Sequence, residues 1–363
     1  HSMRGSAGSS PGIAGITMSD ASLLRSILPL LVAALSAGIL VYAAIPTLMP
    51  LFARYALSRP NARSSHRVPT PQGGGAPVVL AVILVTLLAF LTGLAAAKEA
   101  AFRVYYMLLV ASAVAMALMG AADDIRPLPA LSRLAMQAVL VGLVVFGAPE
   151  DWRIVEALPM AAERAIAVVA GVWFVNLTNF MDGIDGIVVA EAVPLSATVA
   201  VLAALGIVSP LGGIVAAALA GAMLGFAPFN RHPARLFLGD VGSLPIGLFM
   251  AALMFELAAR VSIAAAVLLP MYFLADATQT LLKGLANRQN VLAAHRRHAY
   301  QNAVDGGMSA PDVTRQVLGL NIGLAVLALA AIVSQTTVID AGLVLIGLAA
   351  TLVLMRRFRA AGR

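Results

Sequence analysis

Long apolar stretches separated by short polar connections follow one another along almost the whole chain. Eleven of them approach the roughly 20 apolar residues that a helix needs to cross a bilayer. They cover residues 26–52, 76–94, 104–122, 131–147, 161–177, 187–207, 211–229, 244–259, 261–282, 315–334 and 338–355. Several are short or run into a neighbour, so the pattern predicts ten to twelve spanning helices, with eleven as the central value. The expected fold class is an all-α, polytopic integral membrane protein.

The composition supports this class and excludes others. Hydrophobic residues make up 61% of the 363 residues and charged residues 11%, whereas soluble proteins carry about 25% charged residues. A water-soluble enzyme or a disordered chain would need more charge. The chain has no cysteine, which excludes a disulfide scaffold and a thiolate metal site. The net charge of +7 does not require a nucleic acid partner, because membrane proteins accumulate Lys and Arg in their cytoplasmic loops.

One domain accounts for most of the chain. His1-Ser2-Met3 resembles the remnant of an expression tag, and the Gly/Ser-rich residues that follow show no periodicity. Residues 1–18 are therefore expected to be a flexible leader outside the fold. Residues 19–355 are expected to form a single transmembrane catalytic domain, and residues 356–363 a basic cytoplasmic tail.

The distribution of basic residues predicts the orientation in the membrane. If the N-terminus lies outside and eleven spans alternate, most of the 24 Lys and Arg residues fall on one side. The exceptions are Arg4, Arg25, Lys98, Arg103, Arg153, Arg164 and Arg260. Because cytoplasmic loops are enriched in Lys and Arg, the larger set is assigned to the cytoplasm, together with the C-terminus.

The unusual polar residues fall in five connections on this same predicted side, within residues 66–75, 120–124, 176–186, 230–243 and 295–301. Together they predict one site at the cytoplasmic membrane surface. Five acids in them cannot crowd together without protons, an arginine or a divalent cation: Asp123, Asp124, Asp182, Asp185 and Asp240. Oxygen ligands favour Mg²⁺ or Mn²⁺ over Zn²⁺. Glycines beside three of these acids would let the backbone approach a ligand closely.

These features together indicate phosphoryl or pyrophosphate chemistry with a lipidic second substrate. Each motif alone also has a structural interpretation. Asp123 and Asp124 would suit a solvated helix end, and Asp182 and Asp185 a cap on the following helix. Asp276 lies inside an apolar stretch. Such an acid serves either function or a hydrogen bond to a neighbouring helix, and both interpretations stay open.

Five motifs, in one order, resemble the polyprenyl-phosphate N-acetylhexosamine-1-phosphate transferase superfamily (MraY/WecA-like, glycosyltransferase family 4). They are Pro69-Thr70-Pro71 with Gly73-Gly74, Asp123-Asp124, the Asn176 to Gly186 segment, Phe237-x-Gly239-Asp240-x-Gly242-Ser243, and the His-containing loop at 295–301. The resemblance covers about residues 20–355. It implies that a UDP-N-acetylhexosamine gives its sugar-1-phosphate to undecaprenyl phosphate, with Mg²⁺ as cofactor and UMP as the second product.

The resemblance also implies residue roles. It makes Asp123, Asp124 and Asp240 the catalytic residues, and Asp240, Asp123 and Asp182 the metal ligands. Substrate binding is assigned to Asn176, Asn179, Asp182, Asp185, His295, Arg296, His298, Gly74 and Thr70. The implied location is the bacterial inner membrane with a cytoplasmic active site, and a homodimer is left open.

Two departures separate the chain from the pentapeptide-transferase branch. That branch has three consecutive histidines where this chain has His295-Arg296-Arg297-His298, and it tends to have Lys where this chain has Arg133. Both favour the branch that initiates O-antigen-type glycans, with GlcNAc or a 6-deoxy relative such as FucNAc or QuiNAc as the sugar. The pentapeptide transferase remains the alternative.

Two further classes fit less well. A secondary transporter would carry its charges near the bilayer midplane and often show paired repeats, and no similarity between the two halves is visible. A CDP-alcohol phosphotransferase would have Ala-Arg after its first Asp-Gly, where this chain has Ile184-Asp185-Gly186.

Overall fold

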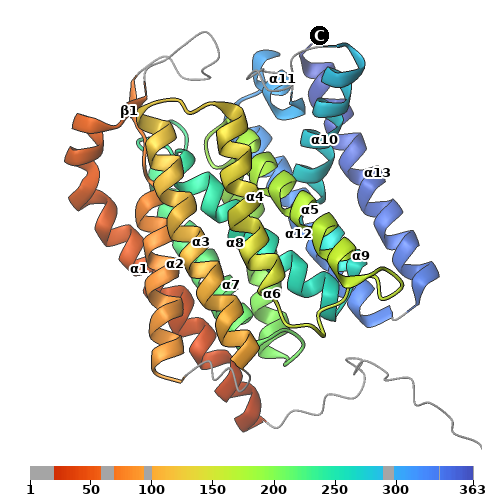
Figure 1. Cartoon of the computed structure of the whole chain (residues 1–363). Helices are drawn as coiled ribbons and strands as arrows, with labels where there is room; N and C mark the ends of the chain where they lie inside the picture. The colour runs from red at the N-terminus through yellow and green to blue at the C-terminus, as the bar shows by residue number, and fades with distance from the viewer. Residues whose placement is uncertain (1–19, 59–68, 94–99, 289–297, 335, 363) are drawn as a thin grey trace, which may run out of the picture.

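The computed structural model describes residues 20–58, 69–93, 100–288, 298–334 and 336–362. Within these residues the chain forms thirteen helices and one short β-ribbon (Figure 1). The helices are α1 (Asp20–Tyr55), α2 (Gly75–Leu91), α3 (Ala100–Ile125), α4 (Ala130–Phe146), α5 (Met160–Met181), α6 (Ile187–Ala204), α7 (Pro210–Asn230), α8 (Asp240–Arg260), α9 (Ile263–Leu268), α10 (Met271–Ala286), α11 (Ala299–Asp305), α12 (Ala310–Ser334) and α13 (Thr337–Ala361). The ribbon pairs β1 (Leu57–Ser58) with β2 (Thr70–Pro71) in antiparallel fashion.

Each predicted apolar stretch is helical, which confirms the all-α, polytopic class. In the described part of the chain, eight helices are long and apolar enough to cross a membrane, and α2 and α4 are shorter apolar helices. The stretch at 261–282 differs from the prediction, because α9 ends at Leu268 and α10 begins at Met271. Pro270 separates them. Proline offers no backbone N–H and clashes with the preceding turn, so a helix breaks there.

Helix ends carry polar residues that the sequence pattern had assigned to loops. Asp123 and Asp124 lie in the last turn of α3, Asn176 and Asn179 lie within α5, and Asp240 is the first residue of α8. The apolar pattern predicts the length inside hydrocarbon, but backbone hydrogen bonds continue the helix beyond it. The acidic residues are therefore held on rigid helix ends.

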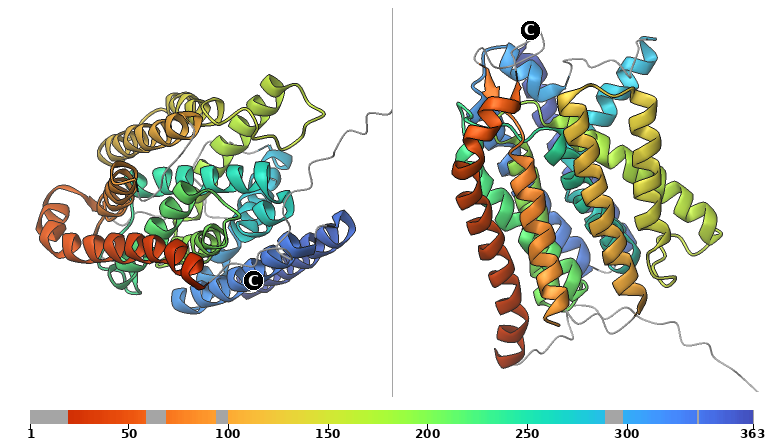
Figure 2. Two further views of the ribbon diagram at one scale, coloured as in Figure 1. Left: turned by 90° about the horizontal axis from the view of Figure 1, so that it is seen from below. Right: turned by 60° about the vertical axis from the view of Figure 1, so that its left-hand side comes forward.

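Two helices form the centre of the bundle. In the most apolar stretch of α7 and of α8, 83% of the residues are buried inside the protein. In the corresponding stretch of α1 and of α13, 17% are buried. Figure 2 shows α1 (red) and α13 (blue) on the outside, with green and teal helices between them. Leu28, Leu35 and Ile39 of α1 are exposed, which suits a surface in contact with lipid. Helices satisfy their own backbone hydrogen bonds, as a bilayer interior requires.

The connections that carry the predicted chemistry share one end of the bundle. Figure 1 places β1, α11, the α3–α4 connection and the C-terminal residues at this end, whereas α1 begins at the opposite end. This alternation agrees with the predicted order of the spans. We call this end the polar end of the bundle.

Candidate active site

The two acids at the end of α3, Asp123 and Asp124, have different partners. Asp123 faces a cationic side chain. Its carboxylate accepts the backbone N–H of Leu128 at 2.6 Å and forms an ion pair with the guanidinium of Arg133 in the first turns of α4. The α3–α4 connection brings these residues together, because Pro127 and Pro129 prevent the helix from continuing. Sequence reasoning had noted Arg133 only as a difference between branches.

Asp124 caps the helix that follows the Gly239 turn. Its two carboxylate oxygens accept the backbone N–H groups of Asp240 and Val241, each at 3.1 Å. These amides at the start of α8 have no partner within the helix, and a carboxylate there also suits the helix dipole. Gly239 has a φ of +74°, and a Cβ at this position would lie 2.8 Å from Asp124 Oδ2. The turn therefore requires glycine.

Asp240 lies where four helices meet. Its Oδ1 accepts a hydrogen bond from Asn179 Nδ2 of α5 at 2.7 Å, and the same amide donates to Ser243 Oγ at 2.9 Å. Its Oδ2 lies 3.8 Å from Arg133 Nη1, the same nitrogen that pairs with Asp123. The structure thus brings α3, α4, α5 and α8 together around this carboxyl group.

Asp182 adds charge without a partner. It follows the last residue of α5 and is half-buried. In the described part of the chain, no donor or cation pairs with its carboxylate. Burial, followed by the negative charges of Asp124 and Asp185, raises the pKa of Asp182 to about 7. A carboxyl group held in this way favours the approach of a cation, which would relieve the repulsion.

The acid cluster, defined as Asp123, Asp124, Asp182 and Asp240, has four carboxyl groups and one neighbouring guanidinium, that of Arg133. Its oxygen donors and uncompensated Asp182 fit a hard divalent cation such as Mg²⁺. Among the described residues, no three acidic or histidine side chains already stand in a metal-binding arrangement. In this arrangement the guanidinium of Arg133 is the cation between Asp123 and Asp240.

Asp185 belongs to a different contact. Its buried carboxylate lies 2.7 Å from His232 Nδ1 and accepts the backbone N–H of Ala234 at 3.1 Å. Nearby, Asn230 Oδ1 accepts the backbone N–H of Gly186 at 2.8 Å. These bonds join the α5–α6 connection to the α7–α8 connection. Asp185 is therefore an anchor between two connections, and its charge reaches the cluster through its effect on Asp182.

The two asparagines that were predicted to bind substrate have different contacts. Asn179 contacts the acid cluster, as described above. Asn176 instead donates to Gln137 Oε1 of α4 and to the backbone oxygen of Val172. Gln137 is buried. Asn176 therefore stabilises the packing of α4 against α5, one helical turn below the cluster.

Thr70 and Gly74 pack beneath the α7–α8 connection. Both are buried, and Gly74 donates its backbone N–H to Phe237 O at 2.9 Å. A Cβ on Gly75 would lie 2.1 Å from the Cα of Gly242, because α2 and α8 cross in contact there. Gly74, which the resemblance assigned to substrate binding, lies against the side chains of Phe226 and Leu236 in this structure.

The histidine-containing loop is described in part. His295 and Arg296 lie outside the described residues. His298 is 3% exposed, immediately precedes α11, and stacks on Tyr300 with ring centroids 5.7 Å apart. Its Nδ1 lies 3.9 Å from Asp276 Oδ1. The imidazole is thus packed inside the protein, beside Tyr300 and Asp276.

Asp276 has the second of its two expected roles, a hydrogen bond to a neighbouring helix. Its carboxylate is fully buried and accepts the backbone N–H of Ala299, with both oxygens 2.9 Å from the nitrogen. Thr280 Oγ1 lies 3.4 Å away, and Arg359 of α13 lies 3.8 Å away. Asp276 therefore holds α11 and α13 against α10.

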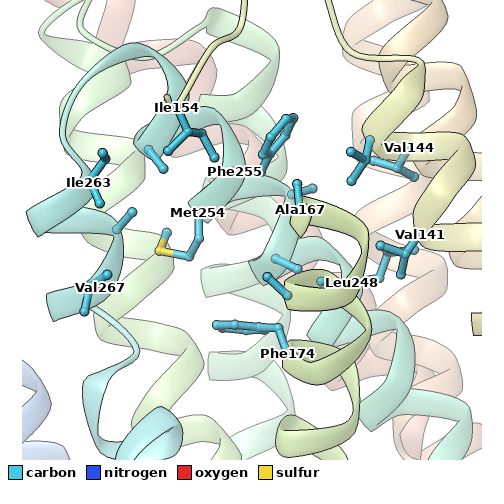
Figure 3. A pocket seen from close by; sticks show the side chains of 17 residues that line it. Val141, Val144, Ile154, Ala167, Phe174, Leu248, Met254, Phe255, Ile263 and Val267 are labelled. Atoms are coloured by element: carbon cyan, nitrogen blue, oxygen red, sulfur yellow. The ribbon is translucent and has the colours of Figure 1, made fainter. Parts of the chain in front are cut away.

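An apolar cavity of about 240 Å³ lies away from the polar end. Figure 3 shows its lining, which comes from α4, α5, α8 and α9 and from Ile154. Phe174, Leu248, Met254 and Phe255 contribute, and none of the lining residues is charged. This cavity lacks the groups needed for phosphate chemistry, so the acid cluster is the candidate active site.

Comparison with known proteins adds an independent observation. Residues 106–258 match the family model of glycosyl transferase family 4. The matched segment is less than half of the chain. It contains the whole acid cluster together with Arg133 and Asn179, and it leaves out Thr70, Gly74 and the loop at 295–301.

Curated relatives agree with this match. A decaprenyl-phosphate N-acetylglucosaminephosphotransferase of Mycobacterium tuberculosis is 30% identical over 246 residues, which are 60% of this chain and 58% of the relative. A phospho-N-acetylmuramoyl-pentapeptide-transferase of Oceanobacillus iheyensis is 40% identical over 78 residues, 22% of this chain and 24% of the relative. The phospho-N-acetylmuramoyl-pentapeptide-transferase of Caldanaerobacter subterraneus is 28% identical over 194 residues, which are 49% of this chain and 58% of the relative.

The matched region spans less than two thirds of the length of these relatives. Within that region, the resemblance to polyprenyl-phosphate N-acetylhexosamine-1-phosphate transferases is confirmed at the level of the family.

Proposed function

We propose that this protein transfers a HexNAc-1-phosphate group from a UDP-N-acetylhexosamine to a polyprenyl phosphate at the polar end of its helical bundle. The products are a polyprenyl-diphospho-sugar and UMP. The observation that carries the proposal is the acid cluster, in which Asp123, Asp124 and Asp240 meet beside Arg133 and Asp182 lies near enough for the charge of Asp124 to raise its pKa. The match of the segment that contains the cluster to glycosyl transferase family 4 supports the same reaction.

The metal that this reaction needs is Mg²⁺ or Mn²⁺, held by Asp123, Asp182 and Asp240. When bound, it supplies positive charge that offsets the repulsion between two anionic substrates and stabilises the departing UMP. Arg133 supplies a fixed positive charge at the same place. Asn179 orients Asp240 through the 2.7 Å hydrogen bond, and Asp124 fixes the start of the helix on which Asp240 stands.

The lipid phosphate attacks the β-phosphorus of the UDP-sugar directly. With a second pKa of about 6, as in phosphoserine, such a phosphate is largely dianionic near neutral pH. It needs little help from a general base, and positioning supplies most of the rate enhancement. Both Asp124 oxygens are engaged by backbone amides, which makes this carboxylate a poor nucleophile.

The preferred donor is UDP-GlcNAc or a 6-deoxy relative (FucNAc or QuiNAc), the acceptor is undecaprenyl phosphate, and the step initiates an O-antigen-type or related envelope polysaccharide. The match to the mycobacterial N-acetylglucosaminephosphotransferase runs over a longer segment than those to the pentapeptide-transferases, which supports this preference. The second supporting feature is Arg133, which stands where the pentapeptide-transferase branch tends to have Lys. We place the enzyme in the bacterial inner membrane with the polar end in the cytoplasm.

The test is release of UMP from a panel of UDP-sugars by the full chain in detergent or nanodiscs. We expect release that requires both Mg²⁺ and undecaprenyl phosphate, with UDP-GlcNAc or a 6-deoxy HexNAc as the best donor. Release only from UDP-MurNAc-pentapeptide would instead assign the pentapeptide-transferase reaction. No UMP from any donor, together with substrate uptake into proteoliposomes, would favour a transporter.

A further inference from the structure

A chain of contacts connects Asp276 inside the bundle to the backbone next to Asp182. Asp276 accepts the N–H of Ala299 at 2.9 Å and also that of Tyr300, so it holds the first turn of α11. Amides in a first turn have no partner within the helix. A fully buried carboxylate at this point fixes where α11 begins relative to α10.

Tyr300 carries this position on to the α5–α6 connection. Its ring is fully buried, and its hydroxyl donates to the backbone oxygen of Phe180 at 3.0 Å. Phe180 lies in the last turn of α5, where carbonyl groups lack a partner within the helix. Two residues later stands Asp182, the acid without a cation. The tyrosine hydroxyl therefore completes the helix end that presents this acid.

The packing around this hydroxyl is close. A Cβ on Gly183 would lie 2.2 Å from Tyr300 Oη and 3.1 Å from Gln301 Nε2. The far end of the same connection is held in a similar way, since Thr314 Oγ1 of α12 donates to the backbone oxygen of Asp185 at 2.9 Å. Two hydroxyl groups from the C-terminal part of the chain thus hold both ends of the acidic segment. Both donors lie outside the family-matched segment.

We infer that Asp276 and Tyr300 are positioning residues for Asp182: Asp276 fixes α11, and the Tyr300 hydroxyl transmits that position to residues 180–183. Both act through backbone groups, Asp276 through the N–H of Ala299 and Tyr300 through the carbonyl of Phe180. The catalytic consequence rests on the proposed function, whereas the structural consequence does not. The relay explains why a buried acid remains in the bundle although it lies outside the site: it serves the site through the backbone of α11.

Tyr300→Phe is the main test, because it removes only the hydroxyl and keeps the ring that stacks on His298. Tyr105→Phe is the matched control. Tyr105 is also buried and also donates to a backbone oxygen, that of Ala252 at 3.3 Å, but it lies near the opposite end of α3. Amide hydrogen exchange of the full chain in nanodiscs, without substrate or metal, reports on residues 180–186 whatever reaction the protein catalyses.

We expect Tyr300→Phe to accelerate exchange at residues 180–186 by about threefold to tenfold, the range for one lost hydrogen bond, and Tyr105→Phe to leave these amides unchanged. Asp276→Ala should accelerate exchange in both 299–305 and 180–186, and Asp276→Asn, which retains an acceptor oxygen, should do so less. Unchanged exchange at 180–186 in Tyr300→Phe would overturn the relay, even if Asp276→Ala failed to fold.

The enzymatic readout separates positioning from a loss of folded protein. We expect Tyr300→Phe to raise the half-saturating Mg²⁺ concentration severalfold while the KM for undecaprenyl phosphate stays within about twofold. A smaller active fraction would lower the apparent kcat alone, and that result would argue against positioning. If the wild type releases no UMP, the proposed function fails, but the exchange result still decides whether the relay exists.

Discussion

The carboxylate of Asp124 holds the backbone of Asp240, with 3.1 Å between Asp124 Oδ1 and the Asp240 nitrogen. The last turn of α3 thus caps the first turn of α8, and one acid of the site sets the place of another. Asp123, the neighbour of Asp124, instead pairs with Arg133. Two consecutive acids therefore do different work, which gives them different expected responses to substitution.

Asp124→Ala should destabilise the protein by about 1 kcal/mol, the usual effect of losing a helix cap, and should lower activity strongly because Asp240 loses its fixed position. Asp124→Asn keeps one acceptor oxygen and should fall between wild type and alanine in both respects. Thermal unfolding in detergent and UMP release measure the two effects. An alanine variant as stable and as active as wild type would contradict the capping role.

Asp240→Asn should abolish transfer while the protein still inserts and purifies normally. The substitution removes a negative charge from the cluster. It also places an NH₂ donor next to two other donors, Asn179, which hydrogen-bonds to Asp240, and Arg133, which lies near it. Asp312→Asn, at an exposed ion pair with Arg315, is the control and should retain full activity. Near-wild-type UMP release by Asp240→Asn at saturating Mg²⁺ would remove Asp240 from the proposed ligand set.

Arg133→Gln should strengthen binding of Mn²⁺ by up to about fivefold, because it removes a partly exposed cation that competes for Asp123 and Asp240. Turnover should fall, since the fixed positive charge is lost. Arg126→Gln makes the same change of net charge at an exposed position nearby and should alter neither quantity. Electron paramagnetic resonance titration of the purified protein measures the affinity, and equal affinity in wild type and Arg133→Gln would exclude competition.

No covalent phospho-sugar should form on Asp123 or Asp124. Wild-type protein incubated with UDP-GlcNAc labelled in the β-phosphate, without lipid, should carry no label after denaturing electrophoresis. Adding undecaprenyl phosphate should move the label into the organic phase. Label mapped by peptide sequencing to either aspartate would refute direct attack and establish a two-step route.

Gly75→Ala should destabilise the protein by about 1–3 kcal/mol, the usual range for overpacking, because its Cβ would meet the Cα of Gly242 at 2.1 Å. Neither backbone can yield as a flexible side chain would. Gly142→Ala is the control, since its Cβ meets nothing within 4 Å in α4 and alanine favours a helix interior. Equal melting temperatures for the two variants would contradict the close contact of α2 with α8.

The sequence alone determined the membrane class, the order of the spans and the set of acids that gather at one end. Those properties depend on local hydrophobic length and on alternation across a bilayer, which are readable along a chain. Tertiary structure alone decided how the acids are used: Asp124 caps α8, Asp185 contacts His232, Asp276 holds α11, and Asp123 and Asp240 face Arg133. The partners that make these differences are separated by as few as 10 residues, for Asp123 and Arg133, and by as many as 116, for Asp124 and Asp240. Spacing in a sequence carries no information about which backbone amide or cation will stand opposite a carboxylate.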